Sequence, residues 1–240
     1  ANHNAGAAAS SQTRAIFAGG DTQPALSNVI QFHEMATSGD YADFGDLTQA
    51  RRFYGCGASS NNNPGISIDN FARPDIDPVG DIGFVMGGAT PSSVNTVEQF
   101  SLASSGNAED FGNLTGTSDQ AGGFSDVVRA VRASGHTAGS LAVTTDTIFF
   151  QSKGNAADFG DSTQARRRGA GLSNNTRGVH GGGHTPTKVN TIDYYTIASS
   201  GNATDFGDLA SATTQAGATS SSTRGVFGGG NTGSAINVMQ

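Results

Sequence analysis

The chain has 240 residues, with 13 basic and 20 acidic side chains and a net charge of −7, so nucleic acid is disfavoured as a main partner. A single cysteine, Cys56, excludes an internal disulfide framework, and no apolar run is long enough to span a membrane. Glycine makes up 35 residues and only 14% of residues are charged, a composition that would allow disorder if the apolar residues were not regularly spaced.

One unit recurs along the chain with a period near 47 residues. Each copy has a glycine-rich head, an apolar middle and an Asp-Phe-Gly tail. Successive head glycines lie 68, 47, 48 and 47 residues apart, because about 20 residues near 61–79 are inserted in the second copy. The last head glycines are Gly20, Gly88, Gly135, Gly183 and Gly230, and the tails begin at Asp43, Asp110, Asp158 and Asp205.

The copy at 176–209 is the cleanest. A small polar segment at 166–175 precedes the head at 177–183, and turn residues separate both from a segment rich in β-branched and aromatic residues at 189–198. The tail at 205–209 follows. No part has a helical period with caps, so we predict four short strands per unit, which is typical of a β-propeller blade.

The chain is therefore predicted to be a single all-β propeller domain covering residues 1–240, with about five blades. The expected blades are 1–49, 50–115 with the insertion 61–79, 116–163, 164–210 and a partial 211–240. Because Gln240 aligns with Asp193, the last blade stops 16 residues before the position of Leu209. The missing strand pair would come from beyond Gln240, from before Ala1 or from another chain, and a ring of six or seven blades in a longer protein fits equally well. Both ends fall within a unit, so we expect a piece of a longer polypeptide or a processed one.

Two columns of apolar residues are expected to form the core between blades. One head residue per blade would point to an inner face: Ile16, Phe84, Val131, Val179 and Val226. Each tail supplies one large ring, which would stabilise the fold by roughly 3 to 5 kcal/mol if buried. These rings are Phe44, Phe111, Phe159 and Phe206. The head glycines are expected to allow close strand approach or positive φ.

The insertion at 61–79 is the one stretch that does not repeat, and it contains three prolines. Long insertions in propellers form loops at one face, where recognition sites tend to lie. We therefore predict a partner-binding loop here, with an exposed decoration loop as the alternative. Its candidate contact residues are Asn62, Asn63, Asp69, Asn70, Phe71 and Arg73.

The histidine and aspartate residues that could bind a metal are expected to have structural roles instead. His180 and His184 are four residues apart and His136 aligns with His184, but other copies hold residues such as Phe and Ala at these positions. Three pairs of tail carboxylates could bind Ca²⁺: Asp43 with Asp46, Asp158 with Asp161, and Asp205 with Asp208. Their recurrence favours turns that accept backbone hydrogen bonds. We expect no metal and no other cofactor.

The arginine runs at 51–52 and 166–168 could contact acidic glycans or a partner chain, with solvated or interblade hydrogen bonding as the alternative. Cys56 is expected to be a small packed residue. A hydrolase or lyase would need a clustered acid and base in one set of loops, and the sequence shows only repeated aspartates without a unique partner. We therefore expect no enzymatic activity.

The unit resembles the kelch-type propeller repeat, in which an arginine, a strand ending in Gly-Gly, a strand ending in an aromatic residue, and an aromatic residue with leucine follow in order. Those places are filled here by Ala165-Arg166, Gly182-Gly183, Tyr194-Tyr195, Phe206 and Leu209. Phenylalanine stands in place of the usual tryptophan, and Thr117 and Thr213 stand near where arginine is expected. The resemblance covers essentially the whole chain and implies a kelch-like propeller of four-stranded blades.

A closer resemblance is to repeats of the form TRGVFGGG…IDY-TIAS-GNATDFGDLT-AR, which are associated with virion proteins of marine tailed phages, especially cyanophages. It implies a non-enzymatic virion structural protein, such as a tail fibre, a capsid decoration or a host-adhesion appendage. Its partners would be other virion proteins, copies of itself in a homo-oligomer, and a host surface glycan or protein. A bacterial extracellular or envelope propeller that serves as an adhesin or matrix scaffold is the alternative.

Overall fold

All regular elements in the described part of the chain are β-strands, which confirms the predicted all-β class. The computed structural model describes residues 6–11, 13–22, 25–52, 58–60, 82–174 and 176–240. None of these residues lies in a helix, so this part of the chain contains no helix that could cross a membrane. The insertion at 61–79, with its six candidate contact residues, lies outside the described residues, and so does Cys56.

Within the described residues the strands form four sheets of four strands, a separate hairpin and a small ribbon. The first sheet contains β1 (Ala7–Ser10), β2 (Arg14–Asp21), β3 (Leu26–Glu34) and β4 (Ala42–Asp46). The second sheet contains β5 (Ala58–Ser60), β6 (Ile82–Met86), β7 (Thr96–Ser101) and β8 (Glu109–Asn113). The third sheet contains β9 (Gly122–Ser125), β10 (Arg129–Ala133), β13 (Thr144–Phe149) and β14 (Ala157–Asp161).

The fourth sheet contains β15 (Ala170–Ser173), β16 (Arg177–Gly181), β17 (Thr191–Thr196) and β18 (Thr204–Asp208). The hairpin contains β19 (Gly217–Ser220) and β20 (Gly225–Gly228), and the ribbon β11 (His136–Thr137) and β12 (Ser140–Leu141). Neighbouring strands are antiparallel and follow one another in chain order across each sheet. The head of each unit is thus the second strand, and the Asp-Phe-Gly tail is the fourth.

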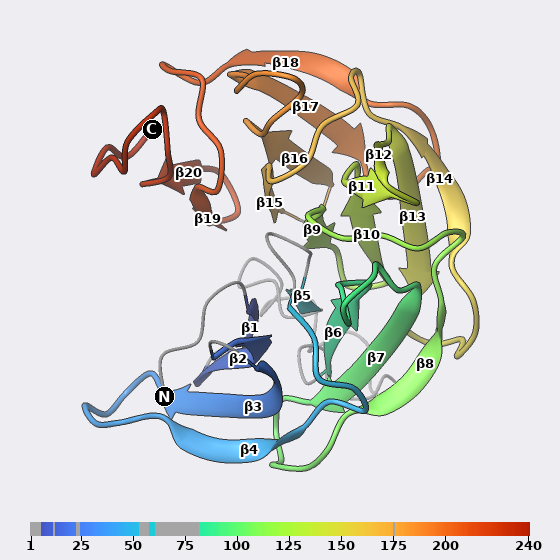
Figure 1. Ribbon diagram of the computed structural model, residues 1–240, viewed down its shortest axis with the longest axis vertical. Coiled ribbons are helices and arrows are strands. Elements are labelled where there is room, and N and C mark those ends of the chain that lie inside the picture. Colours follow the sequence, from blue (N-terminus) through green and yellow to red (C-terminus); the bar gives the residue numbers. More distant parts are fainter. Residues whose placement is uncertain (1–5, 12, 23–24, 53–57, 61–81, 175) are drawn as a thin grey trace.

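The sheets are arranged like the blades of a propeller around a common centre (Figure 1). The first strands β1, β5, β9, β15 and β19 lie nearest the centre, and each contacts the next in that order. The hairpin contacts the fourth sheet through β15, whereas in Figure 1 it is separated from β1 and β2 of the first sheet. The described residues therefore form a propeller-like ring of four sheets with a two-stranded hairpin beside the fourth.

Each of the four described sheets has a register shift between its third and fourth strands. The shifts lie at Ile30/Gln31, Val97/Glu98, Thr145/Asp146 and Ile192/Asp193. Such a bulge bends the strand and changes the direction of a side chain. In the second, third and fourth sheets the residue just after the shift is a buried carboxylate, so the bulge marks a charged position in the interior.

The tail glycines allow the outer strand of one sheet to contact the next sheet closely. The φ angle is +152° at Gly45, +157° at Gly112 and +138° at Gly160, a range that favours glycine. A Cβ atom at these positions would lie 2.1 to 2.5 Å from a carbonyl oxygen of the following sheet. Any other residue at these positions would therefore both strain the backbone and separate the sheets.

Apolar side chains fill the three interfaces between neighbouring four-stranded sheets. The ring pairs across them are Phe44 with Phe100, Phe84 with Phe150 and Phe159 with Tyr195, at centroid distances of 6.1, 5.0 and 6.1 Å. The predicted head residues Ile16, Phe84 and Val131 are at most 1% exposed, and the tail rings Phe44, Phe111 and Phe159 at most 3%. The predicted core is thereby confirmed for the first three units.

The predicted core is wrong for the fourth and fifth units. Phe206 is 52% exposed, and Val179 and Val226 are only half-buried. The hairpin that follows the fourth sheet lacks a complete third strand and any fourth strand in the described residues. A tail ring is buried only where the third strand of the following sheet lies against it, and Phe206 has no such neighbour.

The end of the described chain begins a third strand on the hairpin. Phe227 N donates to Gln240 O at 2.8 Å, Gln240 N donates to Phe227 O at 2.7 Å, and Gly229 N donates to Val238 O at 2.9 Å. Met239 faces Gly228 in an isolated antiparallel bridge. This is the register in which β17 pairs with β16 one unit earlier.

Candidate functional site

Among the described residues, three arginine–carboxylate ion pairs are buried in the interior, one in each of the second, third and fourth sheets. The third strands of the second, third and fourth sheets carry Glu98, Asp146 and Asp193, all 0% exposed. Their partners are Arg51, Arg132 and Arg166, at N–O distances of 2.5, 2.7 and 2.9 Å. Charges taken out of water are tolerated only when they are paired in this way. Each of these pairs lies within one predicted blade, so Arg51 and Arg166 are neither solvated nor paired across blades, and, being buried, they cannot contact a glycan or a partner chain.

The third sheet obtains its arginine from a different sequence position. Ser118 stands where the second and fourth units have Arg51 and Arg166. The cation comes instead from β10, where Arg132 Nη2 lies 2.7 Å from Asp146 Oδ2 and Nη1 donates to Ser118 Oγ at 3.0 Å. The second, third and fourth sheets therefore each bury one such charge pair, although the arginine comes from different sequence positions.

A threonine of the preceding sheet donates a hydrogen bond to each buried carboxylate. The pairs are Thr48 with Glu98, Thr115 with Asp146 at 2.5 Å, and Thr163 with Asp193 at 2.6 Å. Each buried charge thus also joins two neighbouring sheets. At the hairpin the positions of this threonine, arginine and carboxylate hold Ala210, Thr213 and Gln240. The hairpin therefore lacks the threonine, the arginine and the carboxylate of this arrangement.

His180 occupies in β16 the place that Arg132 has in β10, and it is fully buried. Its Nδ1 lies 3.3 Å from Arg166 Nη2, and its Nε2 has no hydrogen-bond partner among the described residues. Gly122 and Gly169 lie so close to the ring that a side chain at either position would overlap with it. Burial, followed by the charge of Arg166, lowers the pKa of His180 well below its ordinary value of 6.5. His180 is therefore a neutral, packed residue.

This lowered pKa makes the stability of the fold depend on pH. The unfolded chain binds a proton at His180 near pH 6.5, whereas the folded protein does not. The contribution to stability is therefore complete above pH 6.5 and is lost as the pH falls below it, by at most about 1.4 kcal/mol per pH unit. We expect His180→Gln to flatten this slope between pH 7.5 and pH 5, measured by urea unfolding.

His184→Asn is the matched control, because the next unit has Asn231 at that position. The pKa of His184 is lowered less, and its ring lies in a loop that is partly exposed. We expect this variant to keep most of the pH dependence. An unchanged slope in His180→Gln would show that other groups cause the loss of stability in acid.

The tail carboxylates act within turns and bulges. Asp158 Oδ1 accepts a hydrogen bond from Gly160 N at 3.3 Å, and Asp205 Oδ1 accepts one from Gly207 N at 3.1 Å. Among the described residues, no three His, Cys, Asp or Glu side chains are placed to hold a metal ion together. The observed hydrogen bonds agree with the interpretation of the tails as backbone-bonding turns.

The loops between second and third strands form a common surface, which we call the loop face. It comprises the loops 87–95, 134–143, 182–190 and 229–237 and the segments before β9, β15 and β19 that bridge to them. The bridges join Asp119 to His136, Arg167 to His184 and Thr214 to Asn231. Because every sheet repeats the same strand order, these loops lie at the same end of every sheet.

The loop face rests on a strained but well-bonded backbone. Gln120, Arg168 and Gln215 have φ angles of +58°, +60° and +59°, which cost non-glycine residues about 1 kcal/mol or more each. Gln215 N donates to Arg168 O at 2.9 Å, and Arg168 N donates to Gln120 O at 2.7 Å. This backbone chain links the third sheet, the fourth sheet and the hairpin. Strained residues held by their surroundings are common at functional surfaces.

The loop face of the fourth unit is cationic. Arg167, Arg168 and Lys188 surround His184, and burial followed by these three charges lowers the pKa of the imidazole. Nε of Arg167 and Nδ1 of His184 are shielded from solvent and have no hydrogen-bond partner among the described residues. Three positive charges thus lie together in a chain whose net charge is −7. An anionic group placed here would be attracted by all three.

The loop face between the second and third units has a hollow of about 460 Å³, which is lined by polar side chains such as Ser93, Asp119 and His136 and by apolar groups such as Pro91 and Ala138. Asp119 lies 3.6 Å from His136 Nδ1, accepts a hydrogen bond from Ser93 Oγ at 3.1 Å and another from Gln120 Nε2 at 3.1 Å. The carboxylate stands between the serine and the histidine, so the imidazole cannot take the serine proton as in a catalytic triad. The hollow suits hydrogen bonding to a polar ligand.

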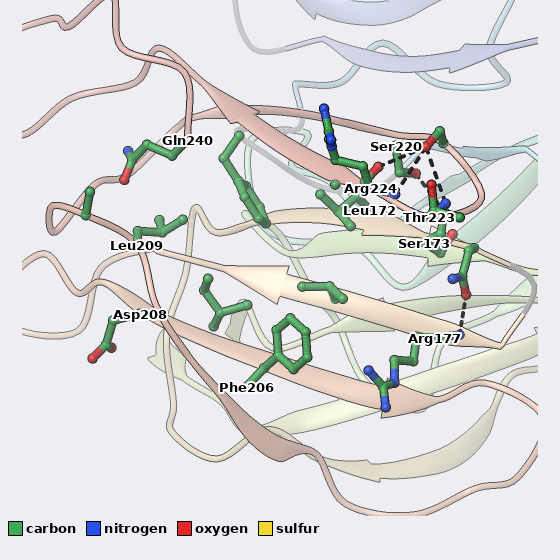
Figure 2. Close-up of a pocket in the computed structure, with 17 residues that line it drawn as sticks. Leu172, Ser173, Arg177, Phe206, Asp208, Leu209, Ser220, Thr223, Arg224 and Gln240 are labelled. Carbon is green, nitrogen blue, oxygen red and sulfur yellow. Dashed lines mark hydrogen bonds between the residues drawn. The ribbon is translucent and has the colours of Figure 1, made fainter.

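Another hollow lies between the fourth sheet and the hairpin, and it is mainly apolar. Figure 2 shows Phe206 of β18 and Leu172 of β15 directed into this space, with Arg177 and Arg224 near its edges. Its volume is about 420 Å³. The hollow occupies the position of the filled interfaces between the other sheets.

The sequence analysis placed a partner-binding loop in the insertion. It also named the arginine run at 166–168 and the histidines His136 and His184, which lie on the loop face, but it did not name Asp119. An alignment of the units could have identified this position, because Asp119, Arg167 and Thr214 occupy it in the third, fourth and last units. A position whose chemistry differs between otherwise similar units is a candidate for recognition. The predicted residues of the insertion lie outside the described part of the chain, so that prediction stays open.

No protein-family model and no curated protein matches the chain.

Proposed function

We propose that the protein is a non-enzymatic structural component of a virus particle, such as a tail fibre, a capsid decoration or a host-attachment appendage. In this proposal a kelch-like propeller of five four-stranded blades serves as an interaction scaffold on the outside of the particle. The sequence resemblance to marine phage virion repeats motivates the location. The propeller-like ring of sheets supports the role of a scaffold.

The observation that carries the proposal is that equivalent loops of the repeated units carry different polar and charged side chains. Repeated Arg and Asp residues are engaged within the protein, in the buried pairs of Arg132 with Asp146 and Arg166 with Asp193 and in the turn that Asp205 bonds. The loop face, in contrast, presents unlike groups on one frame: an acid with a histidine in the third unit and a cationic group in the fourth. Recognition surfaces on rigid scaffolds are built in this way. We infer that the loop face binds a surface glycan or protein that carries negative charge.

The location is tested by quantitative mass spectrometry of purified virus particles. The proposal expects this chain in a fixed ratio to the major capsid protein through successive density gradients. Recovery with the bacterial envelope, and not with particles, would overturn it in favour of an extracellular adhesin or matrix scaffold.

Recognition is tested by an exchange of residues between units of the same chain. We expect Arg167→Thr, Arg168→Gln and Lys188→Ala, combined, to weaken binding to sulfated or carboxylated polysaccharide at least about tenfold, because each removes a charge that faces the ligand. The replacements are the residues found at the same positions of the last unit, so the fold should tolerate them. Binding is measured on glycan-coated biosensors at two salt concentrations.

Lys153→Ala is the matched control, since it removes a positive charge that is 56% exposed on the side chain and lies near Glu109. It should leave polysaccharide binding unchanged. Equal losses in the control and in the exchanged variant would indicate that net charge alone governs binding and that the loop face has no special role.

A further inference from the structure

The three filled interfaces between sheets share one design, which shows what a fourth would need. On one side lies the outer strand of a sheet with its Asp-Phe-Gly tail. On the other side lie the third strand of the next sheet and the Ser-Gly-Asn-type turn that follows it. At the third interface, Tyr195 packs 5.2 Å from Phe124 and 6.1 Å from Phe159, and Gly201 N donates to Phe159 O at 2.7 Å.

The turn also closes the rim of each interface with an asparagine. Its side-chain oxygen accepts a hydrogen bond from a backbone N–H of the preceding outer strand. The pairs are Asp46 with Asn107, Asn113 with Asn155 and Asp161 with Asn202, each at 3.1 Å. The same contact therefore occurs three times with one geometry.

The outer face of the fourth sheet carries the same design without the second side. Phe206 is 52% exposed, whereas the three equivalent rings are at most 3% exposed. Gly207 has a φ of +124°, yet a Cβ at this position would meet no atom within 4 Å. The equivalent glycines each lie against a carbonyl of the next sheet. Gly207 thus has the backbone conformation of the equivalent glycines, although no neighbouring sheet contacts it in the described part of the chain.

The head arginine of the fourth sheet also lacks its usual acceptor. Arg14 donates to Ala103 O at 2.7 Å, and Arg129 donates to Ala198 O at 3.1 Å, in each case just beyond the third strand of a neighbouring sheet. Arg177 occupies the same position, and its side chain makes no such bond among the described residues. Its guanidinium lies over Tyr194 and Phe206 at 4.7 and 5.6 Å.

We propose that this open half-interface is the docking surface for a β-hairpin of the same repeat. The first strand of the hairpin lies along β20 in the register that Val238–Gln240 begin, and it fills the hollow in Figure 2. An aromatic residue, equivalent to Tyr195, packs on Leu172 and Phe206. A Ser-Gly-Asn-type turn then lies against Gly207, and a second strand completes the sheet.

Two features fix the chemistry of this occupant. The hollow is lined by apolar groups such as Leu172, Val179 and Ile192, so alternate residues of the entering strand are apolar. The set Ala210, Thr213 and Gln240 is uncharged, so the position of the buried ion pair needs no arginine or carboxylate partner at this interface. The direction of entry follows from Gln240, which already pairs with Phe227 in the register of a third strand.

The experiment extends the protein after Gln240 with a copy of residues 194–210, the segment that follows the aligned Asp193. We expect the midpoint of thermal unfolding to rise by about 5 °C or more, because the extension buries Phe206 and Leu172. We also expect hydrogen exchange at the backbone amides of β20 to slow at least about tenfold. Phe206→Ala should lower the midpoint much more in the extended protein than in the original chain.

The control is the same extension with serine at the copied positions of Tyr195 and Ile197. It has equal length and the same turn residues, and we expect it to leave the midpoint and the exchange rates unchanged. Equal behaviour of both extensions would overturn the proposal. So would a dimer of the unextended chain that Phe206→Ala dissociates, because a second copy would then occupy the surface. Neither result depends on whether the protein belongs to a virus particle.

Discussion

Replacing Arg166 by alanine is expected to lower the free energy of unfolding by about 3 to 5 kcal/mol. The guanidinium lies 2.9 Å from Asp193, and neither side chain is exposed to solvent. Burial lowers the pKa of Arg166, an effect that the Asp193 carboxylate opposes. Without the arginine, Asp193 would remain buried with a hydrogen bond from Thr163 but no positive charge. Urea unfolding at pH 7.5 measures the loss.

The chain itself supplies the matched control for this variant. Thr163→Ala, Arg166→Thr and Asp193→Gln, combined, reproduce the neutral set Ala210, Thr213 and Gln240 of the next unit. Removing both charges together avoids the unpaired buried carboxylate. We expect the triple variant to be more stable than Arg166→Ala by at least about 2 kcal/mol. A triple variant as unstable as the single one would mean that packing of the arginine, and not charge pairing, stabilises this interface.

Replacing Phe159 by alanine is expected to cost about 3 to 5 kcal/mol of unfolding free energy. The ring is 1% exposed and packs against Tyr195 of the next sheet. Tyr195 is itself held by a hydrogen bond of 2.6 Å to Ser162, and burial raises the pKa of its hydroxyl. Loss of the ring leaves a cavity between two sheets that cannot close easily.

Phe206→Ala is the matched comparison, because it removes the same residue of the same tail one unit later. This ring is half in solvent and has an edge contact with Tyr194 at 5.7 Å. We expect a cost of at most about 1 to 2 kcal/mol. Urea unfolding of both variants compares them directly, and equal costs would show that Phe206 is covered in solution.

Much of the fold follows from local spacing in the sequence. The period near 47 residues, the β-branched middle segments and the turn residues between them predict four strands per unit, and the four sheets have these strands. The sequence identifies the tail glycines only as part of a repeated motif. The structure explains why glycine is needed in the first three tails: each contacts the next sheet, as Gly160 contacts Gly201, 41 residues further along the chain.

The candidate site was less predictable, because its residues come from different units. Arg51 and Arg166 looked available for a ligand in the sequence, but each faces a carboxylate 47 or 27 residues further along the chain. His180 looked like half of a metal pair, but the sheet buries it while His184 stays in a loop. Asp119 was not predicted as a site residue, because nothing in its local sequence distinguishes it from the other aspartates.

Side-chain alternation and turn residues, which are local features of the sequence, predict the strands, their order in each unit and the apolar columns. Which charges are buried and which columns are covered depends instead on contacts between sheets. Ion pairs such as Arg132 with Asp146 form where a bulge and a neighbouring sheet bring them together. Phe159 and Phe206 have the same local sequence, Asp-Phe-Gly-Asp, yet one is buried and the other exposed. The difference is the strand that packs against each ring, which local sequence does not encode.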